Sequence, residues 1–443
     1  MRDDKLEKIV SWAKRRGFIF QSSEIYGGIG GVYDFGPHGA ELKNNLKKLW
    51  WKRFVQNRDD VVGMDSSVLM NRTVWKASGH EEGFQDPLVE CKKCHKRFKK
   101  DDLKKNQCPD CGGELTKERQ FNLMLKTFVG PVEDSASMTY LRPETAQGMF
   151  VDFKTILETS RQKLPFGIAQ IGKSFRNEIT PGNFIYRMRE FEIAEIEYFV
   201  KPGEDEKRFE YWVRQWQTFF LDLGIKKSNL KLKEYPKKDL AHYSKRTIDL
   251  IYNFPFGWQE LAGIANRTNY DLKRHQEFSG KNLAPTPLPY VIEPTLGIER
   301  AILAILIDAF EVVKGGRTKT TEATKEEEIV LHLHPALAPI KVAVLPLVKK
   351  LSKKAQEVYK LLKKDFVAQY DEEGSIGRRY RRQDEIATIV SVTVDFQTLK
   401  DNTVTCRDRD TMAQIRVKIP ELQKAIQKIL EGEEFLKLGE FVK

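Results

Sequence analysis

Two cysteine pairs constrain the fold of this chain more than any other feature, because each pair suits a metal-binding turn. Cys91 and Cys94 form one Cys-x-x-Cys pair, Cys108 and Cys111 form the other, and residues 95–107 separate them. This spacing is typical of a zinc ribbon, in which four thiolates surround one tetrahedral zinc ion. Nothing near them supplies an open coordination position. The pattern therefore predicts a structural zinc rather than a catalytic one.

The alternative for these residues is four unpaired cytosolic thiols, and His95 would compete as a ligand only by straining the turn at Cys94. The five cysteines are too few for a disulfide framework in a chain of 443 residues. The longest apolar stretch, Ala301–Phe310, is shorter than the roughly 18 residues of a membrane span. The charged N-terminus lacks the pattern of a signal peptide. We therefore expect a cytoplasmic protein, without membrane contact, of about two to four domains.

The charge balance favours a polyanionic partner. Lys and Arg number 75 against 63 Asp and Glu, a formal net charge of +12. Such an excess attracts nucleic acid through its phosphates. A lysine-rich surface that serves solubility explains the same excess, so charge alone leaves both interpretations open.

Residues 168–200 predict an antiparallel hairpin with a long loop, with one strand over 168–178 and the other over 186–200. Side chains of a strand alternate between its two faces. A positive side chain, carboxylates and an aromatic ring on one face suit a nucleotide, whereas ordinary surface ion pairs are the alternative. The residues expected to share a face are Arg176 and Glu178 on the first strand and Phe191, Glu195 and Glu197 on the second.

Residues 290–310 predict a strand, a turn shaped by Pro294 and Gly297, and an apolar helix. Helix N-termini attract phosphate, and Arg300 adds a bidentate donor there. Beyond this helix, the polar stretch Lys314–Glu328 predicts an exposed loop. From Ile340 onward strands and helices alternate, which predicts an α/β module of about 100 residues.

Six separated motifs resemble those of class II aminoacyl-tRNA synthetases. Phe175–Glu178 with Arg189–Phe191 resembles motif 2, and Glu293–Arg300 resembles motif 3. The motifs that resemble the glycine-specific enzymes in particular are Tyr33–Pro37, Leu141–Gly148, Trp258–Ala265 and Gly374–Tyr380. The resemblance covers essentially the whole chain, and it is closest to glycyl-tRNA synthetases of the homodimeric class IIa type.

The resemblance implies an α/β (α+β) fold with an antiparallel sheet flanked by helices. Residues 1–84 and 121–335 would form the catalytic core, and residues 85–120 the zinc-ribbon-like insert that splits it. Residues 336–443 would form an α/β anticodon-binding domain. The implied activity is an AMP-forming ligase that makes glycyl-adenylate from glycine and ATP, then transfers glycine to the 3′ end of tRNA(Gly). Its cofactors would be ATP, Mg²⁺ and a structural Zn²⁺, and its partners tRNA(Gly) and a second copy of the chain.

The resemblance also assigns residues to sites. Arg176 and Arg300 would be catalytic. The implied ATP site comprises Arg176, Asn177, Glu178, Tyr186, Arg187, Met188, Arg189, Glu190, Phe191, Glu260, Leu261, Gly297, Ile298, Glu299 and Arg300. The implied glycine site comprises Lys99, Glu144, Phe191, Glu192, Ile193, Ala194, Glu195, Glu293, Pro294, Thr295, Leu296 and Gly297. The zinc ligands would be Cys91, Cys94, Cys108 and Cys111.

A carboxylate-rich pocket suits glycine, because carboxylates hold its ammonium group by charge-assisted hydrogen bonds and close walls exclude a side chain. Two positions depart from the family pattern. Thr295 stands where the family usually has serine, and Lys99 where relatives often carry arginine near the substrate. The rival functions are a synthetase for serine, alanine or proline and a non-catalytic nucleic-acid-binding relative.

Overall fold

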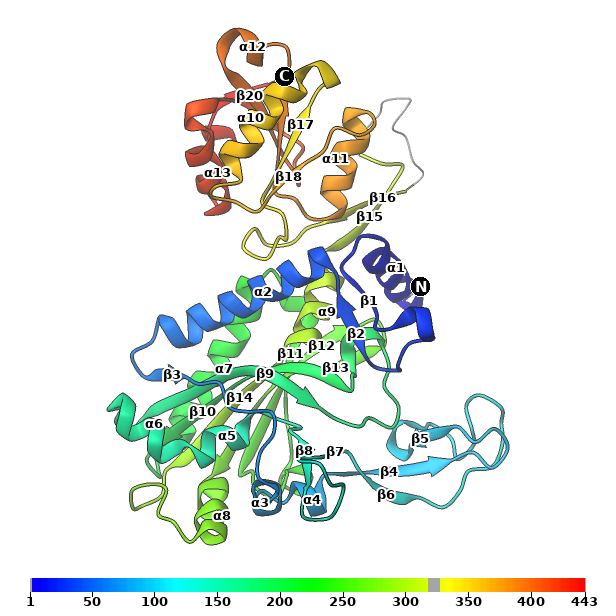
Figure 1. Ribbon diagram of the computed structural model, residues 1–443, viewed down its shortest axis with the longest axis vertical. Helices are drawn as coiled ribbons and strands as arrows, with labels where there is room; N and C mark the ends of the chain where they lie inside the picture. Colours follow the sequence, from blue (N-terminus) through cyan, green and yellow to red (C-terminus); the bar gives the residue numbers. More distant parts are fainter. Residues whose placement is uncertain (1, 318–326, 443) are drawn as a thin grey trace.

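The chain forms three parts that are distinct in Figure 1, namely a body around a large sheet, a slender arm and a C-terminal module. The computed structural model describes residues 2–317 and 327–442. Within these residues, no helix is both long enough and apolar enough to cross a membrane. The body begins with helix α1 (Arg2–Arg15) and the short hairpin of β1 (Ile19–Gln21) and β2 (Tyr33–Phe35).

A seven-stranded sheet forms the centre of the body, in the order β11-β12-β13-β14-β10-β9-β3. All neighbours are antiparallel except β3 and β9, which are parallel. The antiparallel sheet expected from the sequence is thus confirmed. Its strands are β3 (Val61–Gly63), β9 (Phe166–Phe175), β10 (Glu190–Val200), β11 (Leu230–Glu234), β12 (Arg246–Phe254), β13 (Gly257–Thr268) and β14 (Tyr290–Gly297).

Helices cover both faces of this sheet (Figure 1). One face packs against α2 (Pro37–Trp51), α7 (Asp205–Asp222) and α9 (Ile298–Ala309). The other face packs against α5 (Ala146–Val151), α6 (Phe153–Ser160) and α8 (Tyr270–Ser279). Beside that second face lie α3 (Arg72–Ala77), α4 (His80–Gly83) and the hairpin of β7 (Leu125–Phe128) and β8 (Met138–Leu141).

The side chains of strand β10 alternate between an apolar face and a polar face of the sheet. Ile196 and Tyr198 are fully buried beneath α7, where the Tyr198 ring centroid lies 5.3 Å from that of Trp212. Burying each such side chain contributes roughly 1.5–3 kcal/mol. Glu195 and Glu197 project from the opposite face, as the period of two predicts. The apolar face therefore holds the sheet together while the polar face is available for a site.

Two details of the hairpin and helix predictions are wrong. Strand β9 ends at Phe175, so Arg176 and Glu178 lie beyond it rather than within it. The backbone turns away there, because the Arg176 amide donates to Arg189 O (2.9 Å) and the Asn177 amide to Leu123 O (2.8 Å). The turn leaves the Arg176 side chain at the end of the sheet.

The turn predicted around Pro294 is also absent, because β14 continues to Gly297 and α9 begins at the next residue. Pro294 pairs with Ile264 of β13 on one side, while the ladder with β10 is interrupted at Glu293 and Pro294. Proline has no amide hydrogen to donate, which accounts for the interruption. The strand itself is kept by its pairing with β13.

The arm comprises β4 (Gln85–Glu90), β5 (Arg97–Lys99) and β6 (Arg119–Asn122), and it extends sideways from the body in Figure 1. Its buried core contains only Val89, Phe98 and Leu115 besides cysteines. Such a small apolar core stabilises a fold weakly without a further link.

The C-terminal module has a six-stranded sheet in the order β18-β17-β19-β20-β21-β22, with β17 parallel to both of its neighbours. Its strands are β17 (Val342–Pro346), β18 (Ala368–Tyr370), β19 (Val390–Val394), β20 (Thr403–Asp408), β21 (Gln414–Lys418) and β22 (Glu440–Phe441). Its helices are α10 (Ser352–Leu362), α11 (Ile376–Glu385), α12 (Thr398–Asp401) and α13 (Leu422–Leu430). The predicted alternation of strands and helices is present.

A hairpin of β15 (Phe310–Lys314) and β16 (Glu327–Leu331) connects body and module. The predicted loop Lys314–Glu328 falls at its tip, and residues 318–326 of that loop lie outside the described residues. His332 bridges the two parts, with its ring nitrogens 2.6 Å from Asp410 Oδ1 and 2.7 Å from Glu311 Oε2.

Candidate active site

Two adjoining cavities lie at the polar face of the large sheet. The first, here called the arginine pocket, has a volume of about 100 Å³. It is lined by Arg176, Glu178, Ile185, Tyr186, Arg187, Met188, Phe191, Ile193, Glu260, Thr295, Gly297, Glu299 and Arg300. It combines three arginines with aromatic rings and carboxylates, a set suited to a nucleotide.

Arg176 is held in place by aromatic rings and one carbonyl. Its guanidinium carbon lies 5.4 Å from the ring centroid of Phe191 and 5.3 Å from that of Phe84. Its Nε donates to Pro143 O at 3.1 Å. These contacts use one donor and leave the fork of the guanidinium facing the cavity, where it can bind a carboxylate or phosphate.

Arg300 occupies the first turn of α9, where free amides already favour an anion. Its Nη1 lies 2.9 Å from Glu260 Oε1, and its guanidinium carbon lies 4.6 Å from the Tyr186 ring centroid. The partner Glu260 raises the pKa of this partly buried guanidinium against the lowering effect of burial. Burial raises the pKa of the nearby Glu178 carboxyl.

The second cavity, here called the carboxylate pocket, has a volume of about 300 Å³. Its lining includes Glu144, Glu195, Glu293, Arg267, Tyr243, Asp249, Arg176 and Thr295. Arg176 and Thr295 line both cavities, so a ligand in one pocket can meet a ligand in the other at these two side chains.

The carboxylates of this pocket are fixed by separate partners. Glu195 accepts from the Thr145 amide (3.0 Å), from the Thr145 hydroxyl and from Thr295 Oγ1 (2.9 Å). Glu293 accepts from Arg267 Nη1 at 2.9 Å. Glu144 accepts from Gln147 Nε2 at 2.9 Å and lies 3.2 Å from His80 Nε2. Protein partners therefore set the positions of all three carboxylates.

Burial and mutual repulsion act on the protonation of these groups. Burial raises the pKa of Glu195, and it raises the pKa of Glu293 to about 8 despite the attraction of Arg267. For Glu144 burial acts in the same direction, but His80 and Arg267 outweigh it and lower the pKa. The pocket thus combines one firmly ionised carboxylate with others whose charge depends on their surroundings.

The structure brings part of the predicted site residues together. Those that line one of the two cavities are Glu144, Arg176, Glu178, Tyr186, Arg187, Met188, Phe191, Ile193, Glu195, Glu260, Glu293, Thr295, Gly297, Glu299 and Arg300. Those that line neither are Lys99, Asn177, Arg189, Glu190, Glu192, Ala194, Leu261, Pro294, Leu296 and Ile298.

The positions of two non-lining residues have simple explanations. Glu192 follows Phe191 on β10 and so points to the face covered by α2. There Lys43 (2.8 Å) and Lys47 (2.7 Å) bind it. Lys99 lies in the arm and pairs with Asp86 at 2.7 Å.

Sequence reasoning missed Arg267, which is almost fully buried and binds both Glu293 and Asp271. The available signal was an arginine two residues after the apolar run Leu261–Ala265. A charged residue in such a strand needs a buried counter-charge.

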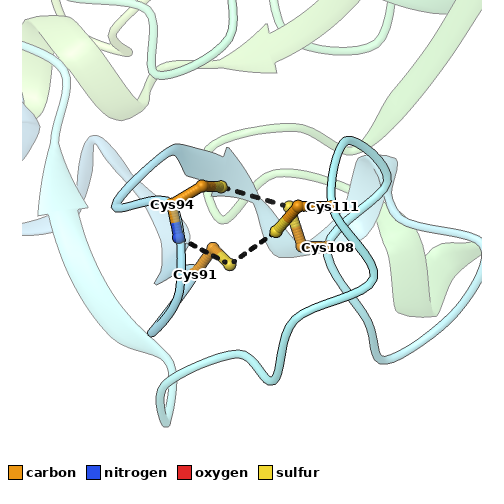
Figure 2. A group of neighbouring side chains, drawn as sticks. All are labelled: Cys91, Cys94, Cys108 and Cys111. Atoms are coloured by element: carbon orange, nitrogen blue, oxygen red, sulfur yellow. Dashed lines mark hydrogen bonds between the residues drawn. The ribbon is translucent and has the colours of Figure 1, made fainter.

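The four cysteines of the arm converge, as Figure 2 shows. Their sulfur atoms lie within 4.8 Å of one another, with 3.5 Å between Cys91 and Cys111 and 3.6 Å between Cys94 and Cys108. Four sulfurs bound to one zinc at about 2.3 Å lie about 3.8 Å apart, so the cluster fits a tetrahedral ion. The Cys94 and Lys93 amides approach the Cys91 sulfur and lower its pKa to about 6. Burial and the neighbouring sulfurs raise the pKa of Cys94 to about 12, and the pKa of Cys111 is also raised.

The chain is similar to known proteins along nearly its whole length. Residues 131–309 match the family described as tRNA synthetase class II core domain (G, H, P, S and T), and residues 341–429 match the anticodon binding domain family. A glycine–tRNA ligase of Clostridium acetobutylicum is 52% identical, covering 96% of this chain and 99% of the relative. The glycine–tRNA ligase of Thermobifida fusca is 48% identical, covering 97% and 99%.

Among solved structures, a prolyl-tRNA synthetase from Cryptosporidium parvum, complexed with L-proline and AMP, shares the fold. It superimposes with a TM-score of 0.63 at 15% identity, covering 96% of this chain and 77% of the other.

Proposed function

Since the chain belongs to the glycine–tRNA ligase family and so aminoacylates tRNA(Gly) with glycine, we propose that its two adjoining pockets bind the two substrates of glycyl-adenylate formation. ATP occupies the arginine pocket and glycine the carboxylate pocket. The observation that carries this assignment is that Arg176 and Thr295 line both cavities. The two substrates therefore meet at Arg176.

In the arginine pocket, the adenine ring stacks on Phe191 and its amino group meets Glu178. Arg176 binds the α-phosphate together with the glycine carboxylate, and Arg187 and Arg300 neutralise the outer phosphates. The fixed position of Arg176 between two rings supports this role, because preorganised charge stabilises the developing pentavalent phosphate. The glycine carboxylate attacks the α-phosphate and pyrophosphate leaves, so no protein nucleophile is required.

In the carboxylate pocket, the glycine ammonium group binds among Glu144, Glu195 and Glu293. Thr145 and Thr295 donate hydrogen bonds to the two carboxylate oxygens of Glu195, and these bonds fix the orientation of the carboxylate. The methyl group of Thr295 narrows the space next to the substrate. A substrate larger than glycine is then excluded by volume, without an editing step.

Two metal ions belong to this proposal. Magnesium would be held by Glu260 with the outer phosphates and would neutralise their charge; carboxylate and phosphate oxygens are its preferred ligands. Zinc would be held by the four thiolates of the arm, where it supplies a structural link. The sulfur distances of the cluster support zinc.

The remaining assignments concern domains and partners. We assign residues 1–84 and 121–335 to the catalytic core, 85–120 to the zinc-binding insert and 336–443 to anticodon binding. The full chain acts as a homodimer in the cytoplasm. Light scattering of the full chain tests the dimer.

The test of the function is amino-acid-dependent ATP–pyrophosphate exchange over all standard amino acids, followed by charging of tRNA(Gly). Glycine alone should support rapid exchange, because the pocket leaves no volume for a side chain. Exchange with serine, alanine or proline, and none with glycine, would refute the assignment of glycine as the substrate. Binding of tRNA without any exchange would favour the non-catalytic relative.

A further inference from the structure

One buried acidic side chain behind the carboxylate pocket has no role in the function described so far. Glu197 lies on β10 two residues beyond Glu195, on the same face, and its side chain is 0% exposed. Neither of its carboxylate oxygens has a hydrogen-bond partner among the described residues. A buried carboxylate without a partner is unfavourable, so the group must either be neutral or await a ligand.

Glu197 faces a second carboxyl across the sheet. The register of β10 and β14 pairs Glu195 with Thr295 and Tyr198 with Ile292, which places Glu197 opposite Glu293. Like charges at opposite positions of antiparallel strands repel each other. Glu293 lines the carboxylate pocket, whereas Glu197 lies behind it.

The positive charge nearby does not suffice for both. Arg267 donates a hydrogen bond from Nη1 to Glu293 (2.9 Å) and hydrogen bonds from Nε and Nη2 to Asp271 (both 2.8 Å). The remaining titratable groups that act on the pair are acidic or phenolic, namely Glu195 on β10, Glu144 before α5 and Tyr243 before β12. Arg176 also lines the carboxylate pocket, where its Nε donates to Pro143 O. Arg267 thus faces an excess of carboxyl groups.

We propose that Glu197 and Glu293 each carry a proton before glycine binds, and that Glu293 releases its proton to solvent when the glycine ammonium group arrives beside it. Glu197 stays neutral and Glu293 becomes the ionised partner of the ammonium group. No covalent bond changes other than one carboxyl O–H, whose proton leaves to water. The inference rests on the proposed placement of glycine, and it makes glycine binding proton-linked.

The energetics of burial agree with this geometry. Burial, with Glu293 as the nearest like charge, raises the pKa of Glu197 well above its ordinary range. Burial raises the pKa of Glu293 to about 8, so near neutral pH this carboxyl is largely protonated before a cation arrives. An ammonium group within hydrogen-bond reach reverses that balance.

The direct test is calorimetry of glycine binding to the full-length protein at pH 7.5 in phosphate, HEPES and Tris, whose ionisation enthalpies differ. The dependence of the observed heat on the buffer gives the protons released per glycine bound. We expect roughly half to one proton, and a glycine KM in pyrophosphate exchange that falls roughly fivefold from pH 7 to 8. Glycine binding with no buffer dependence would overturn the inference.

Glu197→Gln identifies the source of the proton. Its amide keeps the shape of the neutral acid and cannot ionise, so proton release should match that of the parent if Glu293 is the source. Glu293→Gln removes the titrating group itself, so proton release should fall close to zero and KM should lose most of its pH dependence. Glu158→Gln, a change at an exposed position of α6, serves as the control and should release as many protons as the parent.

The outcomes separate this inference from the proposed function. If Glu197→Gln abolishes proton release, Glu197 rather than Glu293 is the source and the inference is wrong although glycine activation stands. If glycine supports no exchange in the parent, the proposed function itself fails. Should the variant not fold, the proton count of the parent still decides the inference.

Discussion

The arm and the carboxylate pocket hold polar side chains together in opposite ways. In the arm, the four sulfurs gather around one another with only a small apolar core beneath them. In the pocket, Glu195 and Glu293 each have protein donors, and a sheet with two large apolar cores supports them. With the zinc proposed for it, the arm would depend on an added ion for its shape, whereas the shape of the pocket is set by its own protein partners.

This difference predicts which changes affect chemistry and which affect folding. A residue of the pocket can be replaced with little change in stability if the large cores remain, so its loss should appear in the rate. Replacement of a cysteine of the arm should first lower the metal content and the local order of the arm. The following predictions test this contrast, beginning with the largest effect.

Arg176→Ala should lower the rate of glycine-dependent pyrophosphate exchange by on the order of a hundredfold or more, because a preorganised charge at the α-phosphate is lost. Its melting temperature should change little. Exchange kinetics and thermal unfolding measure the two quantities. The matched control is Arg214→Ala on the exposed side of α7, which should exchange normally. Near-normal exchange by Arg176→Ala would make its role structural.

Cys108→Ser should reduce bound zinc from about one ion per chain towards none, because the remaining thiolates leave the coordination incomplete. tRNA charging should fall several-fold more than pyrophosphate exchange, since the arm lies outside both pockets. Metal analysis and the two assays measure this. Cys406→Ala, at the cysteine of β20, should retain its zinc. Full zinc content in Cys108→Ser would disprove the four-thiolate site.

His332 provides an intermediate case, a cation held by carboxylates at a partly exposed joint. The hydrogen bond to Asp410 raises its pKa, with Glu311 adding to the effect against burial. Because the pKa of His332 is higher in the folded protein than in the unfolded chain, protonation of its ring stabilises the fold. This stabilisation is complete below the unfolded pKa of about 6.5 and is lost as the pH rises through the folded pKa. His332→Gln should therefore lower the melting temperature at pH 6 by no more than about 2 °C, and less at pH 9. An equal difference at both pH values would exclude the charged imidazolium.

Thr295→Ser should have the smallest effect. Its hydroxyl keeps the 2.9 Å bond to Glu195, so kcat/KM for glycine should stay within a few-fold of the parent. Loss of the methyl should favour alanine slightly, since such a group is worth about 1–3 kcal/mol in discrimination. Thr295→Ala loses the hydrogen bond and should reduce glycine activation more. If Thr295→Ala matches the parent with both amino acids, this side chain does not contact the substrate.

Much of the fold could be predicted because its signals are local in sequence. The period of two along β10 separates Glu195 from Ile196, and the paired cysteines predict their own convergence. The end of β9 could not be predicted, because the backbone of Asn177 turns to Leu123, more than fifty residues away. The assignment of site residues remains a prediction, although the structure brings Arg176, Glu195 and Thr295 to adjoining cavities.

Arg267 received no functional assignment, and Glu197 was placed only on the polar face of its strand, for a related reason. The role of each depends on which group lies across the sheet: Arg267 binds Glu293, 26 residues further on, and Glu197 lies opposite Glu293, about one hundred residues further on. Hydrophobic pattern specifies which face a residue occupies, but it does not specify its neighbour on the next strand.

The strand order has a consequence for biosynthesis. β14 is the last of the seven strands to leave the ribosome, yet it lies between β13 and β10 in the finished sheet. Until residue 297 has been made, the nascent chain can form only two half-sheets, each with an open edge available for wrong pairing. Insertion of β14 closes both edges and delivers Glu293 and Thr295 in the same event. With the proposed glycine site, closure of the sheet and assembly of the amino-acid pocket are therefore one step.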